Sequence, residues 1–526
     1  MNPVEALGSN ARRRWWLLAA VFVLSNLCLS PLLAQPTLHD AEPNDMPAQA
    51  QRVAGEVRIV GSLAKDDQDG YLWTVADTDA VTRWNLELHG IPGHLTKVEV
   101  VRLEWAEDGQ GVARKQVLAS FGSRDGTRPG RLDQVLFEPG AYLLGVAKSG
   151  GEGQYRLDIG KGARVPTARG SQGQATRDTA GRMRGGAAYT AYLETPEAWW
   201  RWELAGDDAG RRWALTATVP LGRRAVLALH DAAGRKLADV RADDRGHFAL
   251  PDLALEPGAY LVQLRREGEE GMVALLEAHT TGARVAGQEE EPNDTLRDAN
   301  VVDLAQPVTG RMGRAGDTDS FRFTMGEDGA ETLHELRLEG EWQGLMRLCL
   351  VDDAGQPLQC RDSQEDMALP DLLFEPGEHR VTVSRAQEGG TYRLSLTATG
   401  RFEPGREAEP NDTPATATGM SGRTAKGTLA GRDDVDVFRF TVDEEPQLWR
   451  LQAIGEGLTL TYHDGSGRRV QEMRPGKGQR RTRLSNLFLL PGSHYAAVSG
   501  PRGGDYTLRV LPIGPPDPLM EREPND

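Results

Sequence analysis

Short stretches in which polar and apolar residues alternate recur along most of the chain, and this is the pattern of strands with one buried face. The clearest are residues 316–323 (GDTDSFRF) and 434–440 (DVDVFRF), with weaker counterparts at 67–73 (DQDGYLW) and 196–202 (PEAWWRW). A further alternating stretch follows and runs into Asp and Gly, which form hairpin turns, as in residues 348–355 (LCLVDDAG). Helical periodicity is almost absent. The pattern therefore predicts an all-β chain.

Two strings of residues repeat at nearly constant spacing. Glu-Pro-Asn-Asp recurs along the chain, each time with an acidic residue two positions upstream, and a Pro-Gly turn recurs with its prolines 118, 119 and 115 residues apart. A period near 120 residues indicates tandem domains and not a solenoid of short repeats. Many short strands punctuated by Gly and Pro favour antiparallel β-sandwiches or jelly rolls. We expect four such domains, the second degenerate, at residues 36–160, 165–285, 288–399 and 406–513.

The first 34 residues have the features of a targeting segment. Three arginines, Arg12 to Arg14, precede about twenty mostly apolar residues that end at Ala34. This predicts a signal peptide cut before Gln35, or alternatively an uncleaved signal anchor, and so an exported protein that is periplasmic, surface-bound or secreted. Leu27 before Cys28 is too large for a lipoprotein cleavage site, so we expect no lipid anchor.

The last residues of the sequence match the start of a repeat. Residues 520–526 contain Glu521 and a last Glu-Pro-Asn-Asp at 523–526. We expect these residues to begin a fifth unit, and any catalytic chemistry of the parent protein to lie downstream of them.

The charge of the chain narrows the class of partner. The net charge is -16 and the isoelectric point is near 5.3. A protein that binds duplex nucleic acid needs a basic face, so we expect no nucleic-acid partner.

Two cysteines follow the targeting segment. Cys349 and Cys360 flank residues 352–357, and the midpoint between them falls at a predicted hairpin turn. They would then lie opposite each other on paired strands, at a separation that a disulfide can bridge. In an oxidising compartment we expect the bond, with a stabilisation of about 2–3 kcal/mol. The alternative is two free buried thiols.

The order of these elements resembles the bacterial pre-peptidase C-terminal domain. That order is the acidic string, a strand of the Gly-Asp-x-Asp-x-Phe-x-Phe type, a hairpin, Pro-Gly-x-Tyr and a final Tyr-x-Leu strand. The family is similar to the collagen-binding domains of clostridial collagenases. The resemblance spans Asp40 to Val510, strong in the third and fourth units, fair in the first and weak in the second. It implies a calcium-stabilised jelly roll that accompanies secreted enzymes and surface proteins without catalysing a reaction.

In the collagen-binding relatives the acidic string and the aspartates at the start of the strand share a calcium ion. Calcium takes six to eight oxygen ligands, and carboxylates and amide carbonyls of this kind supply them. The resemblance implies ligands in the third unit at Glu289, Glu291, Asn293, Asp294, Asp317 and Asp319, in the fourth at Glu407, Glu409, Asn411, Asp412, Asp434 and Asp436, and in the first at Asp40, Glu42, Asn44, Asp45, Asp67 and Asp69.

A second interpretation of the acidic string needs no ion. Glu-Pro-Asn-Asp is also good turn chemistry, because Pro fixes φ while Asn and Asp fold back on their own backbone. In the second unit residues 165–168 (VPTA) stand near the expected place and the aspartate pair is missing, so we expect no calcium there.

The sequence contains no catalytic signature that we recognise: no zinc-binding His pair, nucleophile elbow or phosphate loop. His379 and His494 are expected to pack or face solvent, and Trp199, Trp200 and Trp202 to be core residues more often than sugar-binding ones. We expect no enzyme within these residues. Three functions remain open: a calcium-stabilised array that binds or spaces an extracellular or envelope polymer or protein, the front of a longer secreted peptidase or hydrolase, and a structural protein of the periplasm or surface.

Overall fold

The computed structural model describes residues 35–105, 112–162, 173–385, 389–431, 434–443, 445–476 and 478–515. The expected targeting segment, residues 165–168 and the opening of a fifth unit lie outside these residues. Within them the chain is all-β with four short 3-10 helices. None of the helices there is long and apolar enough to cross a membrane.

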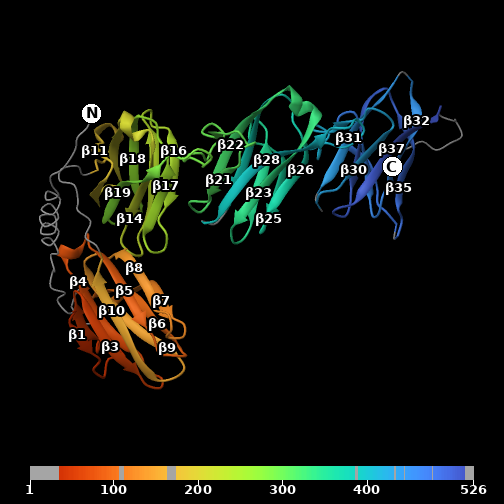
Figure 1. The fold of residues 1–526 in the computed structure, drawn as a ribbon. Helices are drawn as coiled ribbons and strands as arrows, with labels where there is room; N and C mark the ends of the chain where they lie inside the picture. The colour runs from red at the N-terminus through yellow and green to blue at the C-terminus, as the bar shows by residue number, and fades with distance from the viewer. Residues whose placement is uncertain are drawn as a thin grey trace, which may run out of the picture. The chain divides into compact units, whose positions relative to one another are not determined.

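The strands form four successive pairs of sheets, coloured from red to blue in Figure 1. We call the stretches that build them repeat 1 (35–162), repeat 2 (173–285), repeat 3 (286–402) and repeat 4 (403–515). The sheets of repeat 1 are β1 (Thr37–His39), β3 (Val57–Leu63), β10 (Gly153–Lys161), β5 (Arg83–His89) and β8 (Gly130–Leu136), and β2 (Gln51–Ala54), β4 (Asp69–Val75), β9 (Gly140–Ser149), β6 (Leu95–Trp105) and β7 (Val112–Ser123), in order of pairing. A 3-10 helix, η1 (Asp77–Asp79), follows β4.

Among the described residues, repeat 2 keeps this strand order but has no counterpart of β1, so that one of its sheets has four strands. Its sheets are β11 (Gly181–Met183), β13 (Glu197–Leu204), β18 (Gly258–Glu267), β15 (Arg224–Asp231) and β16 (Lys236–Arg241), and β12 (Ala187–Leu193), β19 (Met272–Ala283), β14 (Arg211–Thr218) and β17 (His247–Leu253). Its 3-10 helices are η2 (Arg177–Thr179) and η3 (Gly206–Asp208).

Repeats 3 and 4 have the same strand order as repeat 2. In repeat 3 the sheets are β20 (Asn300–Val301), β22 (Thr318–Met325), β27 (Gly377–Ser384), β24 (Met346–Val351) and β25 (Pro357–Ser363), and β21 (Val308–Arg311), β28 (Thr391–Arg401), β23 (Thr332–Glu341) and β26 (Met367–Leu373), with η4 (Glu327–Glu331). In repeat 4 they are β29 (Thr418–Gly419), β31 (Val435–Val442), β36 (Gly492–Ser499), β33 (Thr459–His463) and β34 (Arg469–Met473), and β30 (Thr424–Thr428), β37 (Asp505–Gly514), β32 (Gln447–Ile454) and β35 (Arg481–Leu489).

The two sheets of a pair share one apolar core. In repeat 4, Phe438 and Val498 from one sheet lie in the same buried cluster as Leu451 and Leu508 from the other. The alternation in β31 explains this, because successive side chains of a strand point to opposite faces and only one face carries the aromatic residues. The buried faces therefore follow the pattern in the sequence.

The expectation of four separate sandwich domains is corrected at the level of the whole chain. The succession of small sheets has the character of a β-solenoid. The chain divides into two compact units and not four, one ending at Arg164 and the other beginning at Val165, so that repeats 2, 3 and 4 belong to one unit. The reason lies in backbone contacts between successive repeats that the sequence pattern does not reveal.

These contacts arise at a repeated irregularity in one strand of each repeat. The ladder shifts register at Gln134, Asp252, Asp371 and Asn486, which have positive φ angles of 57°, 55°, 55° and 60°. Such a bulge turns backbone groups out of the ladder. At Asp371, the carbonyl accepts a bond from Glu409 N at 2.9 Å, and Leu373 N donates back to Glu409 O at 2.8 Å.

The junction between repeats 2 and 3 has the same pair of bonds. Glu291 N donates to Asp252 O at 3.3 Å and Ala254 N donates to Glu291 O at 2.7 Å. In repeats 3 and 4 the glutamate of Glu-Pro-Asn-Asp is thus bonded to the repeat before it.

The Pro-Gly turn is closed by the side chain three residues after the proline. Tyr142 and Tyr260 donate their hydroxyl to the carbonyl four residues upstream, at 2.7 and 3.0 Å. His379 Nε2 and His494 Nε2 bond the equivalent carbonyls at 2.7 and 2.8 Å. Both histidines therefore replace the corner tyrosine.

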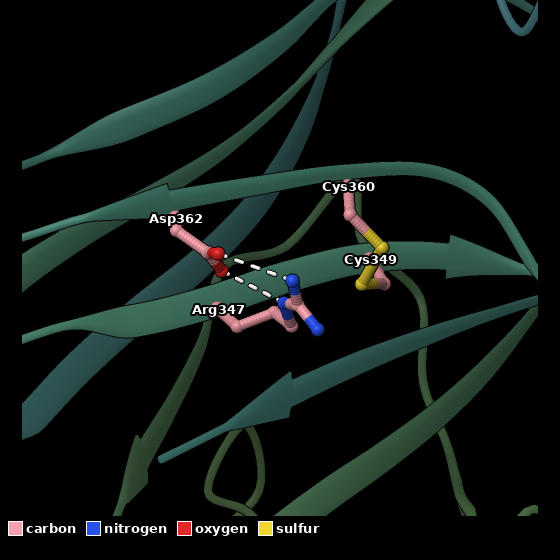
Figure 2. Close-up of a disulfide and its surroundings, with 4 residues drawn as sticks. All are labelled: Arg347, Cys349, Cys360 and Asp362. Carbon is pink, nitrogen blue, oxygen red and sulfur yellow. Dashed lines mark hydrogen bonds and ion pairs between the residues drawn. A yellow bond between two sulfur atoms is a disulfide. The ribbon is translucent and has the colours of Figure 1, made fainter. Parts of the chain in front are cut away.

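The structure joins Cys349 of β24 and Cys360 of β25 in a disulfide (Figure 2), with the two cysteines directly opposite in the ladder. Beside it Arg347 and Asp362 form an ion pair across the same two strands, at 2.8 Å.

Candidate metal centre

The acidic string of repeat 4 is held against the start of β31 by backbone bonds. Asn411 O accepts the amide of Val437 at 3.0 Å, and the Glu409 carboxylate folds back to accept the amide of Asn411 at 2.7 Å. Repeats 1 and 3 contain the same two bonds, and the Glu-Pro peptide bond is cis in all three. Carboxyl groups from two distant segments are therefore brought together.

The cluster of repeat 4 has more buried carboxyl oxygens without a hydrogen-bond partner than either of the other two clusters. One oxygen from each of Glu409, Asp434 and Asp436 lies within 4.8 Å of the others. Asp436 is fully buried, and neither of its carboxyl oxygens has a hydrogen-bond partner. Glu407 accepts a bond from Thr428 N at 2.7 Å.

Asp412, the last member of this set, accepts a bond from Val435 N at 3.1 Å. All six residues that the sequence predicted for repeat 4 therefore lie at this one place.

The same arrangement in repeat 3 contains a cation from the chain itself. Oxygens of Glu291, Asp317 and Asp319 lie within 4.8 Å of one another. Arg314, whose side chain is 7% exposed, forms ion pairs with Glu291, Asp317 and Asp294.

The other two members of the predicted set lie beside these carboxylates. Glu289 accepts bonds from Arg311 N at 2.6 Å and from the Tyr392 hydroxyl at 3.2 Å. Asn293 is fully buried, with no partner for its Oδ1 atom.

In repeat 1 the cluster is more open. Oxygens of Asp40, Glu42 and Asp69 form one group within 4.8 Å, and those of Glu42, Asp45 and Asp67 form a second. Asp69 is 1% exposed, and its Oδ1 atom has no partner.

The side-chain Nδ2 of Asn44 in this repeat donates to Asp40 at 2.5 Å, and Asp67 accepts a bond from Ala64 N at 2.8 Å. The six predicted residues therefore meet here too, around two overlapping groups.

Burial raises the pKa values of these carboxyl groups. In repeat 4, desolvation and then the neighbouring Asp434 raise the pKa of Glu409 to about 9, and desolvation and then Glu407 raise that of Asp436 to about 11. In repeat 1 desolvation raises the pKa of Asp69 to about 7. Burial disfavours the charged form of a carboxyl group and nearby like charges add to the effect, so an ion-free cluster holds protons at neutral pH.

In repeat 3, burial by itself lowers the pKa of Arg314, but the nearby carboxylates, Asp317 first, outweigh it and raise that pKa above its ordinary value. The guanidinium is therefore firmly charged. Burial still raises the pKa of Glu289 to about 7 and that of Asp319 well above its ordinary value.

The sequence analysis assigned both aspartates of each pair to a strand, and this was wrong for the first of them. β22 begins at Thr318 and β31 at Val435, one residue after Asp317 and Asp434. The carboxylate of Asp317 accepts the amide of Gly313 at 2.6 Å instead, and so closes the loop that precedes the strand. This side-chain to backbone bond competes with strand pairing.

Sequence reasoning missed a tyrosine in each cluster. The hydroxyl of Tyr506 donates to Glu407 at 2.7 Å, Tyr392 donates to Asp319, and Tyr155 donates to Asp69. These residues open the final Tyr-x-Leu strand, whose repetition was a usable signal.

A glycine lies opposite each of these tyrosines in the ladder, at Gly61, Gly310 and Gly427. A Cβ atom on Gly427 would lie 1.9 Å from Glu407 Oε2 and 2.2 Å from the Tyr506 hydroxyl. Only a glycine therefore leaves room for the tyrosine to reach the carboxylate.

Repeat 2 has alanines at the corresponding positions. By strand register Ala198 takes the place of Asp319, Ala274 that of Tyr392 and Ala191 that of its glycine. All three alanines belong to the apolar core cluster of the repeat. In repeat 2, three alanines that pack in the core therefore replace the aspartate, the tyrosine and the glycine that leaves room for the tyrosine.

Two of the three tryptophans at the start of β13, Trp200 and Trp202, also belong to that core, and Trp199 packs against His230. Trp200 and Trp202 are fully buried and Trp199 is 7% exposed. Their burial favours packing over a role in stacking on a sugar.

Carboxylate oxygens are the ligands that calcium prefers, and two oxygens on opposite sides of one calcium ion are about 5 Å apart. In each cluster, oxygens of three carboxyl groups lie within 4.8 Å of one another, which is close enough for them to share one ion. Zinc prefers His and Cys ligands, and these clusters contain neither. The donor set therefore suits calcium or a similar divalent cation.

Comparison with known proteins gives weak likenesses. No family model matches the chain. A pre-peptidase C-terminal domain of a collagenase from Bacillus anthracis is similar at 22% identity over 20% of this chain and 100% of that domain, with a TM-score of 0.17. The BSP domain of a biofilm-associated protein is similar at 10% identity over 92% of this chain and 100% of that chain, with a TM-score of 0.13.

Tripeptidyl peptidase 2 is similar at 9% identity over 63% of this chain and 33% of its own, with a TM-score of 0.16. These scores are low, so we base the function on the geometry of this chain's own residues.

Proposed function

We propose that the protein is an exported, non-catalytic array of modules, each built of two packed β-sheets and resembling the pre-peptidase C-terminal domain, in which calcium stabilises individual modules. The array binds or spaces a polymer or protein at the cell envelope or outside the cell. The observation that supports this most directly is Asp436, a fully buried carboxyl group that lies among other carboxyl groups and forms no ion pair with a basic side chain of the described residues.

The energetic argument starts from this burial. A buried charge is tolerated only when it is paired or bound to a metal, and otherwise it takes up a proton. A cation bound by Glu409, Asp434 and Asp436 would supply the missing partner for all three carboxylates at once. When bound, calcium supplies positive charge and a fixed geometry, and in this position its effect is structural.

Two carboxyl groups of this cluster line a cleft. The cleft has a volume of about 460 Å³, and its lining includes Asp412 and Asp434 together with three arginines, Arg347 and Arg361 of repeat 3 and Arg502 of repeat 4. An accessible path is one of the requirements of a binding site.

Two histidines and the two cysteines that the sequence pattern singled out have structural roles. His379 and His494, the two histidines that the Pro-Gly turns place, bond backbone carbonyls and so are engaged in folding. The disulfide between Cys349 and Cys360 supports an oxidising compartment, which accords with export.

Thermal unfolding of the full chain with calcium and with a chelator tests the proposal. A ligand that binds the folded state stabilises it by about 2.7 kcal/mol at one hundred times its Kd, so calcium is expected to raise the unfolding midpoint. Glu409→Gln should reduce this rise, and the matched control Glu456→Gln, whose side chain is 79% exposed in the same repeat, should retain it. Equal midpoints with calcium and with chelator would refute the proposal.

A further inference from the structure

Arg314 lies inside the acidic cluster of repeat 3. Its Nη1 atom donates to Glu291 Oε1 at 3.1 Å and to Asp317, and its Nη2 atom donates to Asp294. Glu291 and Asp317 are two of the three residues whose oxygens group within 4.8 Å. The guanidinium therefore stands where a bound cation would have to contact these carboxylates.

The corresponding position in repeat 4 is a glycine. The loop before each strand is closed by a backbone amide that donates to the first aspartate, from Gly313 in repeat 3 and from Ala430 in repeat 4. The next residue is Arg314 in the first case and Gly431 in the second. The two clusters have the same acidic residues, and repeat 4 has a glycine at the position of Arg314; Arg432 and Asp433, which replace Ala315 and Gly316, lie outside the described residues.

Repeat 4 provides no substitute for the arginine within the described residues. No ion pair of the described residues joins Glu409, Asp434 or Asp436 to a basic side chain, although Arg361 of repeat 3 interacts electrostatically with Asp434 and lines the same cleft. Arg432, next to Gly431, lies outside the described residues, and a variant at that position is therefore part of the test below.

Repeat 1 resembles repeat 4 in this respect. The loop is one residue shorter, and its lysine, Lys65, is exposed. The buried Asp69 has no partner for Oδ1, and no basic side chain shifts its pKa.

A guanidinium and a divalent cation compete for the same oxygens. Arginine pairs strongly with carboxylates because its planar group has several donors and keeps its charge when buried. Once it has bonded three carboxylates, a divalent cation beside it would lose ligands and would be repelled by a like charge. The two arrangements therefore exclude each other.

We propose that the Arg314 guanidinium takes the place of a divalent cation in repeat 3, so that the chain binds two such cations, one in repeat 1 and one in repeat 4. This inference rests on the proposed function, because it assumes that the other two clusters bind calcium. It departs from the sequence-based expectation of a calcium ion in repeat 3, and it makes repeat 3 independent of calcium.

The number of ions bound by the full chain tests this proposal. Calcium binding is measured by equilibrium dialysis, and Tb³⁺ emission excited through the tyrosines beside the clusters provides a second readout. The wild type is expected to bind two ions. Asp434→Asn should lower the number to one, whereas the matched change Asp317→Asn should leave it at two. Arg314→Gly, which copies repeat 4, should raise it to three.

Each outcome separates the inference from the proposed function. If the wild type binds no ion, the proposed function fails. If it binds three, and Asp317→Asn removes one of them, calcium binding stands and the role of Arg314 is wrong. If repeat 4 binds an ion only after Arg432→Ala, Arg432 acts there as Arg314 does in repeat 3, and the contrast between the repeats is wrong. If Arg314→Gly does not fold, the ion counts of Asp434→Asn and Asp317→Asn still show whether repeat 3 binds an ion.

Discussion

Replacing Asp436 by Asn tests the electrostatic description of the cluster in repeat 4. The folded pKa of Asp436 is about 11, against an ordinary value of 3.8. Because the folded value lies above the unfolded one, the stability of the ion-free protein is highest below pH 3.8 and falls as the pH rises toward 11. The cause is that folding at neutral pH must transfer a proton to the buried carboxyl group.

The size of the effect follows from this proton. At pH 7 the solution is about three pH units above the ordinary aspartate pKa, and each unit costs 1.36 kcal/mol, so the penalty is about 4 kcal/mol. Glu407 and Asp436 lie together and take up the proton as a pair, so it is counted once. Asn has nearly the shape of Asp and needs no proton. In chelator at pH 7, Asp436→Asn is therefore expected to be more stable than the wild type by up to about 4 kcal/mol.

Urea unfolding in chelator at pH 4, 7 and 9 measures this difference, with Glu456→Gln as the exposed control. The advantage of the Asn variant should vanish near pH 4 and grow toward pH 9. Added calcium should stabilise the wild type more than the variant, because the variant has lost a charged ligand. An Asn variant that is less stable than the wild type in chelator at pH 7, or an advantage that does not change with pH, contradicts the reasoning.

Two further predictions concern packing and covalent structure. Gly427→Ala should destabilise repeat 4 by about 1–3 kcal/mol and weaken its calcium response, since the new methyl group would overlap the carboxylate of Glu407; Gly422→Ala, with no atom within 4 Å of its added Cβ, should change urea unfolding little. Reduction of the bond between Cys349 and Cys360 should lower stability by about 2–3 kcal/mol, measured by urea unfolding with and without reductant, and mass spectrometry should find two alkylated thiols only after reduction.

The strands could be predicted because their signal is local. In β22 and β31 the alternation of polar and apolar residues sets which side chains are buried, and residues two apart share a face. The pairing of Cys349 with Cys360 could be predicted for the same reason, since a hairpin places residues symmetric about its turn opposite each other.

The tyrosines and Arg314 could not be predicted with the same means. Tyr392 is 73 residues from Asp319, and their contact depends on the packing of two sheets. Arg314 is three residues from Asp317, but only the fold of the loop directs its side chain into the cluster and not into solvent. Sequence reasoning weighs a residue by its type, and an arginine is usually exposed.

The division of the chain was missed because it depends on backbone bonds. The register shift at Asp371 gives Glu409 a backbone hydrogen-bond partner in the preceding repeat. The residue types Asp and Glu do not predict this backbone bond. A repeat period identifies the segments that are duplicated, but it does not show which of them pack together into one compact unit.

The double role of Glu409 leads to a last prediction. The backbone of Glu409 is hydrogen-bonded to repeat 3, and its side chain belongs to the cluster of repeat 4. An ion bound in that cluster should therefore also stabilise the junction between repeats 3 and 4. Glu291 occupies the same position between repeats 2 and 3, but its carboxylate is already held by Arg314. Chelator should therefore accelerate amide hydrogen exchange at Leu373, which donates to Glu409, and leave Ala254, which donates to Glu291, unchanged.

Exchange measured by mass spectrometry on the full chain, with and without calcium, compares the two junctions in one sample. Equal acceleration at Leu373 and Ala254 would mean that both clusters hold an ion, and it would count against Arg314 as the internal cation. Unchanged exchange at Leu373 would show that the junction is set by backbone bonding alone. Faster exchange at Leu373 than at Ala254 in chelator would mean that calcium stabilises the junction between repeats 3 and 4, while Arg314 stabilises the junction between repeats 2 and 3 without an ion.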